Sequence, residues 1–255
     1  MIFDPFGDFE TRGYLRNFDA EKNPESVKVL EHIAFLDNLQ AALENLVNKE
    51  LFAYADVLKT HKILFEFVYP WAGQDREKTV PGVGVSKGSV LFAHPKDARR
   101  AVEHALELGQ DHAFMAEKPG EVMGFLAYGH PFLDGNGRTI MIVHAELARR
   151  ANLRIDWAAT DKVQYLTSLT QELSQPGKGH LDAYLRPFLR DHVGPDPFAH
   201  LTRLPGLAGS SDSETNKVLG SVESPVLKAR YEQQEETWRH AYRSTEILGE
   251  PKPPT

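Results

Sequence analysis

The stretch His130-Pro131-Phe132-Leu133-Asp134-Gly135-Asn136-Gly137-Arg138 is the most informative part of this 255-residue chain. Glycine and asparagine at three successive positions allow the backbone to turn tightly and to point N–H groups toward one place. We predict that a helix begins directly after this turn and covers about 138–150. A backbone nest followed by a helix N-terminus attracts anions, so the stretch predicts a phosphate-binding loop.

Three side chains of this loop add chemistry to the predicted anion site. Arg138 would lie in the first helical turn, where a cation opposes the helix dipole, and a bound anion would remove that conflict. Asp134 is a hard oxygen ligand suited to a Mg²⁺ ion that bridges phosphates. His130 is the residue type that accepts a proton near pH 7. Together these groups indicate phosphoryl or nucleotidyl transfer; the alternative is that each is an ordinary turn residue.

Helical patterns surround the loop on both sides. Leucine or isoleucine recurs every three or four residues at positions 30, 33, 36, 39, 43 and 46, which predicts an amphipathic helix over about 26–48. Between about Thr79 and Ala93, short β-rich pieces alternate with glycine-containing turns and predict a small hairpin. The fold class is therefore mainly α with one hairpin. Further helices are expected at about 54–67, 96–109, 118–128, 160–174 and 178–192.

The composition of the chain changes outside this region. Residues 1–24 are rich in Gly, Asp, Asn and Pro and predict a looped N-terminal arm, followed by a main domain over 25–193. Residues 194–225 are rich in Pro, Gly and Ser and indicate a flexible linker. Apolar residues of 226–248 share one face of a C-terminal amphipathic helix. Such a helix needs a surface to cover it, which is its own domain, a partner or a second copy.

Charge and composition exclude several classes of protein. The chain has 29 Lys and Arg residues against 36 Asp and Glu, and a net charge of −7 argues against general nucleic-acid binding. The absence of cysteine excludes disulfides, thiolate catalysis and iron–sulfur clusters. No apolar run is long enough for a membrane span, and the first residues lack a signal-peptide pattern. We therefore expect a cytoplasmic protein, although export directed by a C-terminal tag would look the same.

The loop resembles the signature of the Fic proteins, HPFx[D/E]GNGRxxR, and matches each specified position from His130 to Arg138. The segment Pro70-Trp71-Ala72-Gly73-Gln74-Asp75-Arg76 resembles the WAGxxR segment that precedes the flap in this family. The hairpin predicted over 79–93 lies where that flap is expected. The resemblance spans about 25–192 and implies a Fido-type helical bundle with a small β-hairpin flap, in which Phe132 is a buried anchor.

The resemblance also implies an activity. Fic proteins usually transfer AMP from ATP to a hydroxyl side chain of a target protein, so the chain resembles a protein adenylyltransferase. By this analogy His130 would deprotonate the target Ser, Thr or Tyr, and Asp134 would hold Mg²⁺ on the phosphates. The flap would bind the protein substrate by adding a strand to its edge, with Lys87 and Phe92 as side-chain contacts. The phosphates would bind to Gly135, Asn136, Gly137 and Arg138.

The chain departs from the family signature at one position. The signature has a second arginine three residues after the first, which serves the terminal phosphate of ATP and pairs with an inhibitory glutamate; this chain has Met141. Three alternatives follow: weak use of ATP, transfer of another group such as UMP, GMP or phosphocholine, or a Fic fold that acts as an interaction module. The related Doc kinases have a lysine where this chain has Gly137, which argues against a kinase.

The sequence does not contain the segment with which proteins of this family inhibit themselves. The family's inhibitory motif, Ser or Thr followed four residues later by Glu and then Gly or Asn, does not occur. The nearest match runs from Gln40 to Asn45, and we expect its glutamate, Glu44, to be an exposed helical glutamate. An antitoxin-like partner therefore remains an alternative source of inhibition, and self-association through the C-terminal helix remains open as well.

Overall fold

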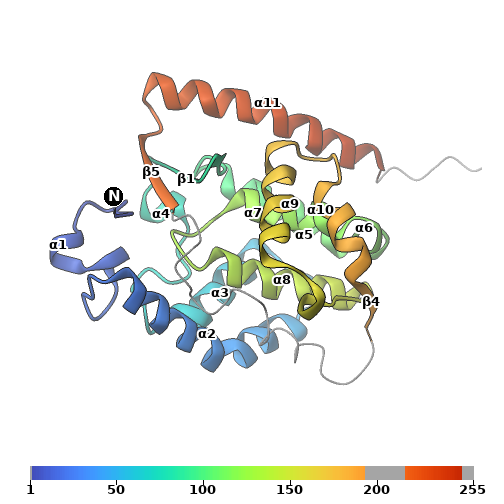
Figure 1. Cartoon of the computed structure of the whole chain (residues 1–255), viewed down its shortest axis with the longest axis horizontal. Coiled ribbons are helices and arrows are strands. Elements are labelled where there is room, and N and C mark those ends of the chain that lie inside the picture. Colours follow the sequence, from blue (N-terminus) through green and yellow to red (C-terminus); the bar gives the residue numbers. More distant parts are fainter. Residues whose placement is uncertain (1, 193–215, 249–255) are drawn as a thin grey trace, which may run out of the picture.

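The structure is a computed structural model that describes residues 2–192 and 216–248, and most of these residues are helical. Figure 1 shows the helices stacked around a central pair, with the longest ones on the outside. This arrangement confirms the expected mainly helical fold with a small β flap. The principal helices are α2 (Pro24–Val47), α3 (Tyr54–Phe65), α5 (Ala98–Gln110), α7 (Pro119–Gly129), α8 (Asn136–Arg150), α9 (Lys162–Ser174), α10 (His180–Leu185) and α11 (Pro225–Leu248).

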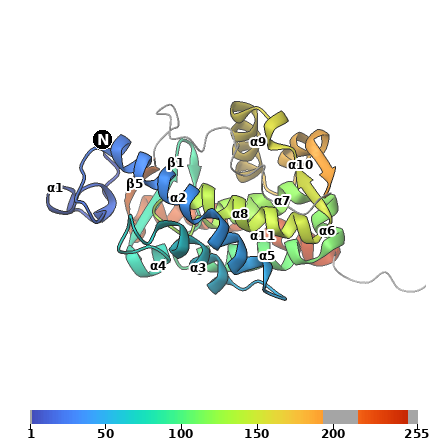
Figure 2. The same ribbon diagram turned by 90° about the horizontal axis from the view of Figure 1, so that it is seen from below.

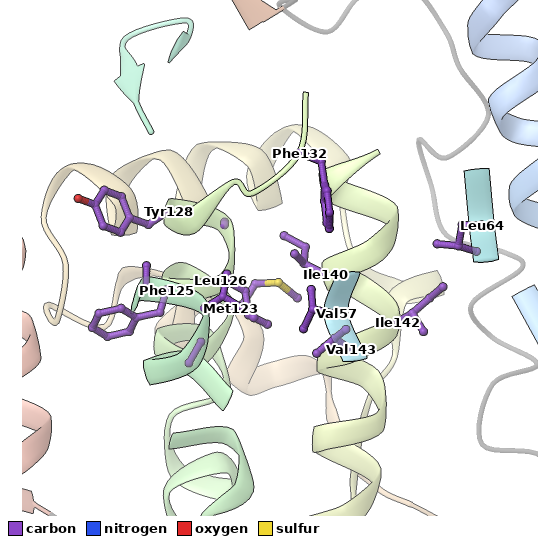
Figure 3. Close-up of a cluster of buried hydrophobic side chains, with 14 of the residues drawn as sticks. Val57, Leu64, Met123, Phe125, Leu126, Tyr128, Phe132, Ile140, Ile142 and Val143 are labelled. Atoms are coloured by element: carbon purple, nitrogen blue, oxygen red, sulfur yellow. The ribbon is translucent and has the colours of Figure 1, made fainter. Parts of the chain in front are cut away.

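Helix α7 is the centre of the fold because each of its residues is buried. Its glycines and apolar residues allow α5, α8 and α10 to pack closely around it. Phe132, which follows α7, is fully buried as expected. Figure 3 shows its ring above Ile140 of α8 and Val57 of α3. The loop between α7 and α8 is therefore anchored directly in the core.

Helix α2 lies where the leucine pattern predicts it. Leu39, Leu43 and Leu46 are buried as predicted, but the first half of the helix buries a different face. Ile33 and Leu36 were expected in the core and are 50% and 42% exposed. The face that packs on the domain contains Val27, Phe35 and a glutamate, Glu31. The pattern was wrong for the first half of the helix because position 31 is polar and yet lies on the inner side.

The predicted hairpin forms and is joined by a strand that was not expected. Strands β1 (Val83–Lys87) and β2 (Val90–Leu91) pair antiparallel, and β5 (Asn216–Ser221) pairs with the other edge of β1. The predicted linker over 194–225 is thus wrong for residues 216–221, since the ladder with β1 satisfies their backbone groups. The linker residues before 216 lie outside the described part of the chain.

The C-terminal helix α11 covers its apolar face with the chain's own domain. Trp238 is 2% exposed, and its ring stacks on Tyr128 of α7 at a centroid distance of 3.8 Å. His104 of α5 is hydrogen-bonded to Thr245 near the end of α11. Figures 1 and 2 show α11 and α2 on opposite sides of the α7–α8 pair. The apolar face that we weighed as a surface for a partner or a second copy is therefore already occupied.

A second small sheet replaces part of a predicted helix. The helix expected over 178–192 ends at Leu185, because Pro187 introduces a short 3-10 turn. The chain then forms β4 (Leu189–Asp191), which pairs antiparallel with β3 (Leu153–Ile155). Short helices α6 (His112–Glu117) and α4 (Arg76–Thr79) were also not predicted.

The N-terminal arm is pinned to the domain by buried aromatic residues. Phe3 and Tyr14 are buried, whereas Phe18 is 61% exposed. The arm contains the short helix α1 (Phe9–Arg12), and the carbonyl of Leu15 accepts a hydrogen bond from Trp71 Nε1 at 2.6 Å. The arm is thus attached to the segment that precedes the flap. Within the described residues, every helix is too short or too polar to cross a bilayer.

Candidate functional site

The loop after α7 has a tightly constrained backbone at both of its ends. Helix α7 ends at His130, which has the left-handed φ of 40° that a non-glycine residue rarely adopts. The next helix, α8, begins after Gly135, whose φ is +74°. A Cβ atom at Gly135 would lie 2.5 Å from a carbon of the Phe65 ring, so only glycine fits there.

The side chain of Asn136 closes this loop. Its Oδ1 accepts a hydrogen bond from the backbone N–H of Phe132 at 2.9 Å, and its Nδ2 donates to the Phe132 carbonyl at 2.7 Å. The amide is therefore used within the loop. What the first turn of α8 offers to a ligand is its backbone N–H groups at 136–138, which have no acceptor inside a helix that begins there. Gly137 is exposed, and nothing lies within 4 Å of a Cβ built on it.

The ring of His130 lies against Phe92, the residue that follows the flap strand β2. It stacks face to face on Phe92 with a centroid distance of 3.5 Å and an interplanar angle of 4°. Burial lowers the pKa of His130 well below its usual value, and the positive charges of Arg76 and Lys87 lower it further. The imidazole is thus neutral, and its buried Nε2 has no hydrogen-bond partner among the described residues.

Arg76 holds the strained end of α7 in place. Its Nε donates to the carbonyl of His130 at 2.8 Å, and its backbone N–H donates to the carbonyl of Pro131 at 2.7 Å. A terminal nitrogen of the same guanidinium donates to the carbonyl of Ala93, beside the flap, at 2.7 Å. Arg76 is fully buried, so these charged hydrogen bonds are shielded from water. One side chain therefore connects the flap to the loop.

His61 of α3 supports the loop from below. Its Nδ1 accepts a hydrogen bond from the Gly73 N–H at 2.9 Å, which leaves the proton on Nε2. Nε2 lies 3.1 Å from the carbonyl of Asp134 and donates to it. The ring also stacks on Phe132 at 3.7 Å. Because burial lowers the pKa of His61 to about 3, this residue stays neutral and positions the loop.

Arg138 is paired with a buried carboxylate from α2. Its guanidinium donates to Glu31 Oε2 at 2.6 Å, and Tyr69 donates its hydroxyl to the other oxygen at 3.0 Å. Burial and the nearby charge of Asp134 raise the pKa of Glu31 to about 7, although Arg138 opposes this rise. Burial lowers the pKa of Arg138, but the charges of Glu31 and Asp134 outweigh that effect, and the pKa is raised overall.

These two directions are consistent once the charges are counted. When Glu31 and Asp134 are both ionised, the cluster carries two negative charges and one positive charge. Arg138 therefore gains from two partners, whereas Glu31 gains from one and is repelled by Asp134. We expected a bound anion to relieve the unfavourable position of Arg138, and Glu31 already does so within the chain.

Asp134 could bind a metal ion only together with a polyphosphate that supplies further ligands. Asp134 is half-buried, and its Oδ1 accepts the Gly135 N–H at 2.8 Å. Within residues 2–192 and 216–248, no three His, Cys, Asp or Glu side chains are grouped to bind a metal. Mg²⁺ commonly uses one or two carboxylates and takes its other ligands from phosphates and water, so a single Asp134 fits this mode.

Three further residues, Met141, Arg149 and Glu44, bear on the departure from the family signature and on inhibition. Met141 packs toward α9, where Tyr165 points its hydroxyl at the sulfur over 4.0 Å. Arg149 is bound to Glu146 within α8 and cannot substitute for a second arginine beside the loop. Glu44 is exposed and accepts a hydrogen bond from Gln40, as expected for an ordinary helical glutamate.

The two flap residues differ from each other. Phe92 is 5% exposed and its ring lies against His130, so its contact with a target stays a prediction. Lys87 is half-buried at the end of β1, close enough to His130 to affect its pKa. Phe92 turns inward because its backbone N–H bonds to the Val85 carbonyl at the end of the hairpin.

Three buried polar residues of the site were missed in the sequence. Glu31 gave a signal, since it lies one turn after Val27 and one turn before Phe35 on the inner face of α2. Arg76 belonged to the segment that carries the family resemblance. His61 gave no signal that distinguishes it from an ordinary helical histidine, because its partners Gly73 and Asp134 are distant in sequence.

The helical bundle, the constrained loop and the flap together define a Fic-type fold. Residues 51–148 match the family model described as Fic/DOC family. The chain therefore carries a domain of the Fic/DOC family, in agreement with the resemblance of the loop and of the flap segment.

Curated relatives support this assignment. The chain is 30% identical over 168 residues to "Protein adenylyltransferase VbhT" of Bartonella schoenbuchensis, covering 62% of this chain and 34% of that protein. It is 30% identical over 130 residues to "Probable protein adenylyltransferase y4lH" of Sinorhizobium fredii, covering 48% of this chain and 65% of that one. The chain thus spans about a third of the first relative and 65% of the second.

A solved structure shares the fold. The N-terminal Fic domain of a putative cell filamentation protein from Bartonella quintana, described as a VirB-translocated effector with bound ADP, superposes with a TM-score of 0.58. The alignment covers 72% of this chain and 94% of that domain at 19% identity. This likeness establishes the fold of the present chain.

Proposed function

We propose that this chain is a Fic-type transferase that moves AMP from ATP onto a Ser, Thr or Tyr hydroxyl of a target protein. The observation that carries the proposal is the loop from His130 to Arg138, in which a neutral buried imidazole and the free N–H groups of a helix N-terminus are held by one rigid core. The names of the two curated relatives, a protein adenylyltransferase and a probable protein adenylyltransferase, support the same reaction class.

In this proposal His130 is the general base. Its neutral ring can take the proton of the target hydroxyl, and the unpartnered Nε2 is the nitrogen that we assign to this step. The hydroxyl oxygen then attacks the α-phosphorus of ATP, and the bond to the bridging oxygen breaks to release pyrophosphate. The lowered pKa of His130 makes its ring a weak base in the absence of nucleotide. The negative charge of a bound polyphosphate would raise that pKa.

The phosphates would bind at the first turn of α8. The backbone N–H groups of Asn136 and Gly137 lie at the N-terminus of α8, where the helix dipole favours a negative charge. Arg138 would add a positive charge, and Asp134 would hold a Mg²⁺ ion that neutralises the phosphates. The bound ADP of the Bartonella quintana domain belongs to that protein and supports a nucleotide as the ligand here.

Met141 leaves the donor open to a second candidate. A thioether cannot replace an arginine at a terminal phosphate, and one lost charge-assisted hydrogen bond is worth roughly 1.5–3 kcal/mol. A donor with a different leaving group would avoid this loss, so transfer of UMP, GMP or phosphocholine is the alternative. An interaction module without catalysis is the third candidate, since Met141 replaces a group that the family's reaction would use.

The test is intact-mass spectrometry of the purified protein after incubation with Mg²⁺ and, separately, ATP, GTP, UTP, CTP and CDP-choline. A bacterial lysate with labelled donor provides protein targets in a parallel reaction. His130→Ala is the loss-of-base variant, and His112→Ala, which removes an exposed histidine at the start of α6, is the matched control. Both variants are first compared with the parent by circular dichroism.

We expect an adduct of one nucleotide monophosphate in the parent and in His112→Ala, reduced by about 10²- to 10⁴-fold in His130→Ala. The added mass identifies the donor. An adduct that is equally strong in His130→Ala contradicts the proposed base. The absence of any adduct, on this protein or in the lysate, favours the interaction module.

A further inference from the structure

The flap strand β1 has both of its edges paired, and one of the pairing strands comes from far along the chain. Strand β2 occupies one edge, and β5 occupies the other over the whole length of β1. The register runs antiparallel from Val83 opposite Ser221 to Lys87 opposite Asn216, with an irregularity between Gly84 and Val85. Figure 1 shows β5 beside β1 at one end of the molecule.

This edge lies next to the candidate site. The Val85 carbonyl of β1 accepts the backbone N–H of Phe92, whose ring stacks on His130. At the other strand, Asn216 donates its side-chain amide to the carbonyl of Leu133 in the loop at 3.1 Å. An extended segment on this edge therefore runs past both the flap and the loop. If β5 left this edge, the edge would be a surface on which extended peptides bind through backbone hydrogen bonds.

Strand β5 is held mainly by its backbone. Four of its six residues are exposed, and Asn216 and Leu219 are half-buried. Leu219 contributes to a small apolar cluster that is separate from the main core, with Leu91, Val222, Leu227 and Tyr231. Because little side-chain area depends on β5, a different strand with one apolar residue at the place of Leu219 would form nearly the same contacts.

Helix α11, by contrast, is held by its side chains. Trp238 stacks on Tyr128 and meets the edge of Phe125, and Ala241 is buried beside them. Removing these groups from the core would expose large aromatic surfaces, each worth several kcal/mol. The helix therefore stays in place when β5 separates from β1, and it keeps β5 close to the edge from which it came.

We propose that β5 is the chain's own exchangeable occupant of the β1 edge, and that an extended segment of the target protein takes its place. This inference rests on the proposed transfer to a protein. The exchange is close to neutral in energy, because backbone hydrogen bonds from β5 are replaced by equivalent bonds from the target. The exchange would make access to the β1 edge selective. A target has to supply an unfolded or loop segment that competes with β5, whose local concentration is high because it belongs to the same chain.

A reversible tether tests the exchange in the complete chain, which has no cysteine of its own. Ser86 and Lys217 are opposite each other in the ladder, so Ser86→Cys with Lys217→Cys places a disulfide between β1 and β5. Leu153→Cys with Asp191→Cys is the matched control, because it joins the paired strands β3 and β4. Figure 1 shows β4 toward the other end of the molecule from β5.

The readouts are label transfer from the active donor to lysate proteins and binding of the same nucleotide by calorimetry, both with and without reductant. In the oxidised β1–β5 variant we expect label transfer to fall at least tenfold and nucleotide binding to stay unchanged. Reduction should restore label transfer fully. The β3–β4 tether should transfer label equally in both states. Undiminished transfer by the oxidised β1–β5 tether would overturn the proposal, because the target would then bind elsewhere.

Hydrogen exchange of the unmodified protein gives a second measurement that needs no target. We expect the amides of 216–221 to exchange at least tenfold faster than those of α11 around Trp238, since the strand opens while the helix remains packed. Equal protection in the two segments overturns the exchangeable strand. If no donor gives label in any variant, the proposed function fails, and the exchange rates still decide whether β5 opens separately.

Discussion

Replacing Glu31 by glutamine should remove a pH dependence of stability that the buried charge cluster creates. Burial and the repulsion from Asp134 raise the pKa of Glu31 from its ordinary 4.5 to about 7 in the folded protein. The fold therefore prefers the protonated form. The free energy of unfolding should fall as the pH rises from about 4.5 to about 7, and should be level above that range.

The size of this effect follows from the two pKa values. At roughly 1.36 kcal/mol for each pKa unit, the interval between 4.5 and about 7 corresponds to about 3 kcal/mol. Glutamine has nearly the same shape as a protonated glutamate and keeps an acceptor for the Tyr69 hydroxyl. Glu31→Gln should thus gain about 3 kcal/mol relative to the parent between pH 4 and pH 8.

The assay is urea denaturation of the parent and of Glu31→Gln at several pH values, followed by circular dichroism. Other groups titrate in the same range, such as Asp182, whose pKa burial raises to about 6, and they cancel in the difference between the two proteins. Glu44→Gln, an exposed change on the same helix, serves as the control and should give a constant difference. If the parent gains stability relative to Glu31→Gln as the pH rises, the attraction of Arg138 outweighs burial and the reasoning is refuted.

Three further predictions concern the loop, the arginine that supports it and the anchoring of α11. Gly137→Ala should leave the melting temperature unchanged, because nothing lies within 4 Å of the new methyl group, while calorimetry should detect weaker ATP binding if phosphates approach the backbone there. Arg76→Gln should lower the free energy of unfolding by about 3 kcal/mol or more, since the buried carbonyls of His130 and Ala93 lose a charged donor, and an NMR titration should find the His130 pKa raised; an unchanged pKa would contradict the assigned influence of Arg76. Trp238→Ala should cost about 3–5 kcal/mol in urea denaturation, and a loss below 1 kcal/mol would show that α11 is not anchored by this ring.

The position of Glu31 has a consequence for ligand binding. A polyphosphate that approaches Arg138 meets a cluster with one surplus negative charge when both carboxylates are ionised. A divalent cation at Asp134 would offset that surplus and would at the same time lower the pKa of Glu31. Phosphate binding without a divalent cation should accordingly be weak, which is consistent with a metal that enters together with the nucleotide.

Short-range patterns in the sequence were sufficient for most helices and for the loop. The helix over 54–65, the hairpin around Gly88 and the turn at Gly135 depend on residues within about one turn of each other. The expected helix over 178–192 failed at Pro187, where the chain leaves the helix to pair with a strand that lies more than thirty residues earlier. Strand pairing of this kind depends on a distant partner, which local patterns do not identify.

The sequence by itself determined the class of the protein, because the nine residues from His130 to Arg138 match the Fic signature at each specified position up to the first arginine. Only the tertiary structure decided what surrounds that loop. Glu31 reaches Arg138 from 107 residues away, Arg76 bonds to the carbonyl of His130, and β5 pairs with the flap. These contacts arise from packing between elements that are distant in sequence, where no periodic pattern specifies which partners meet.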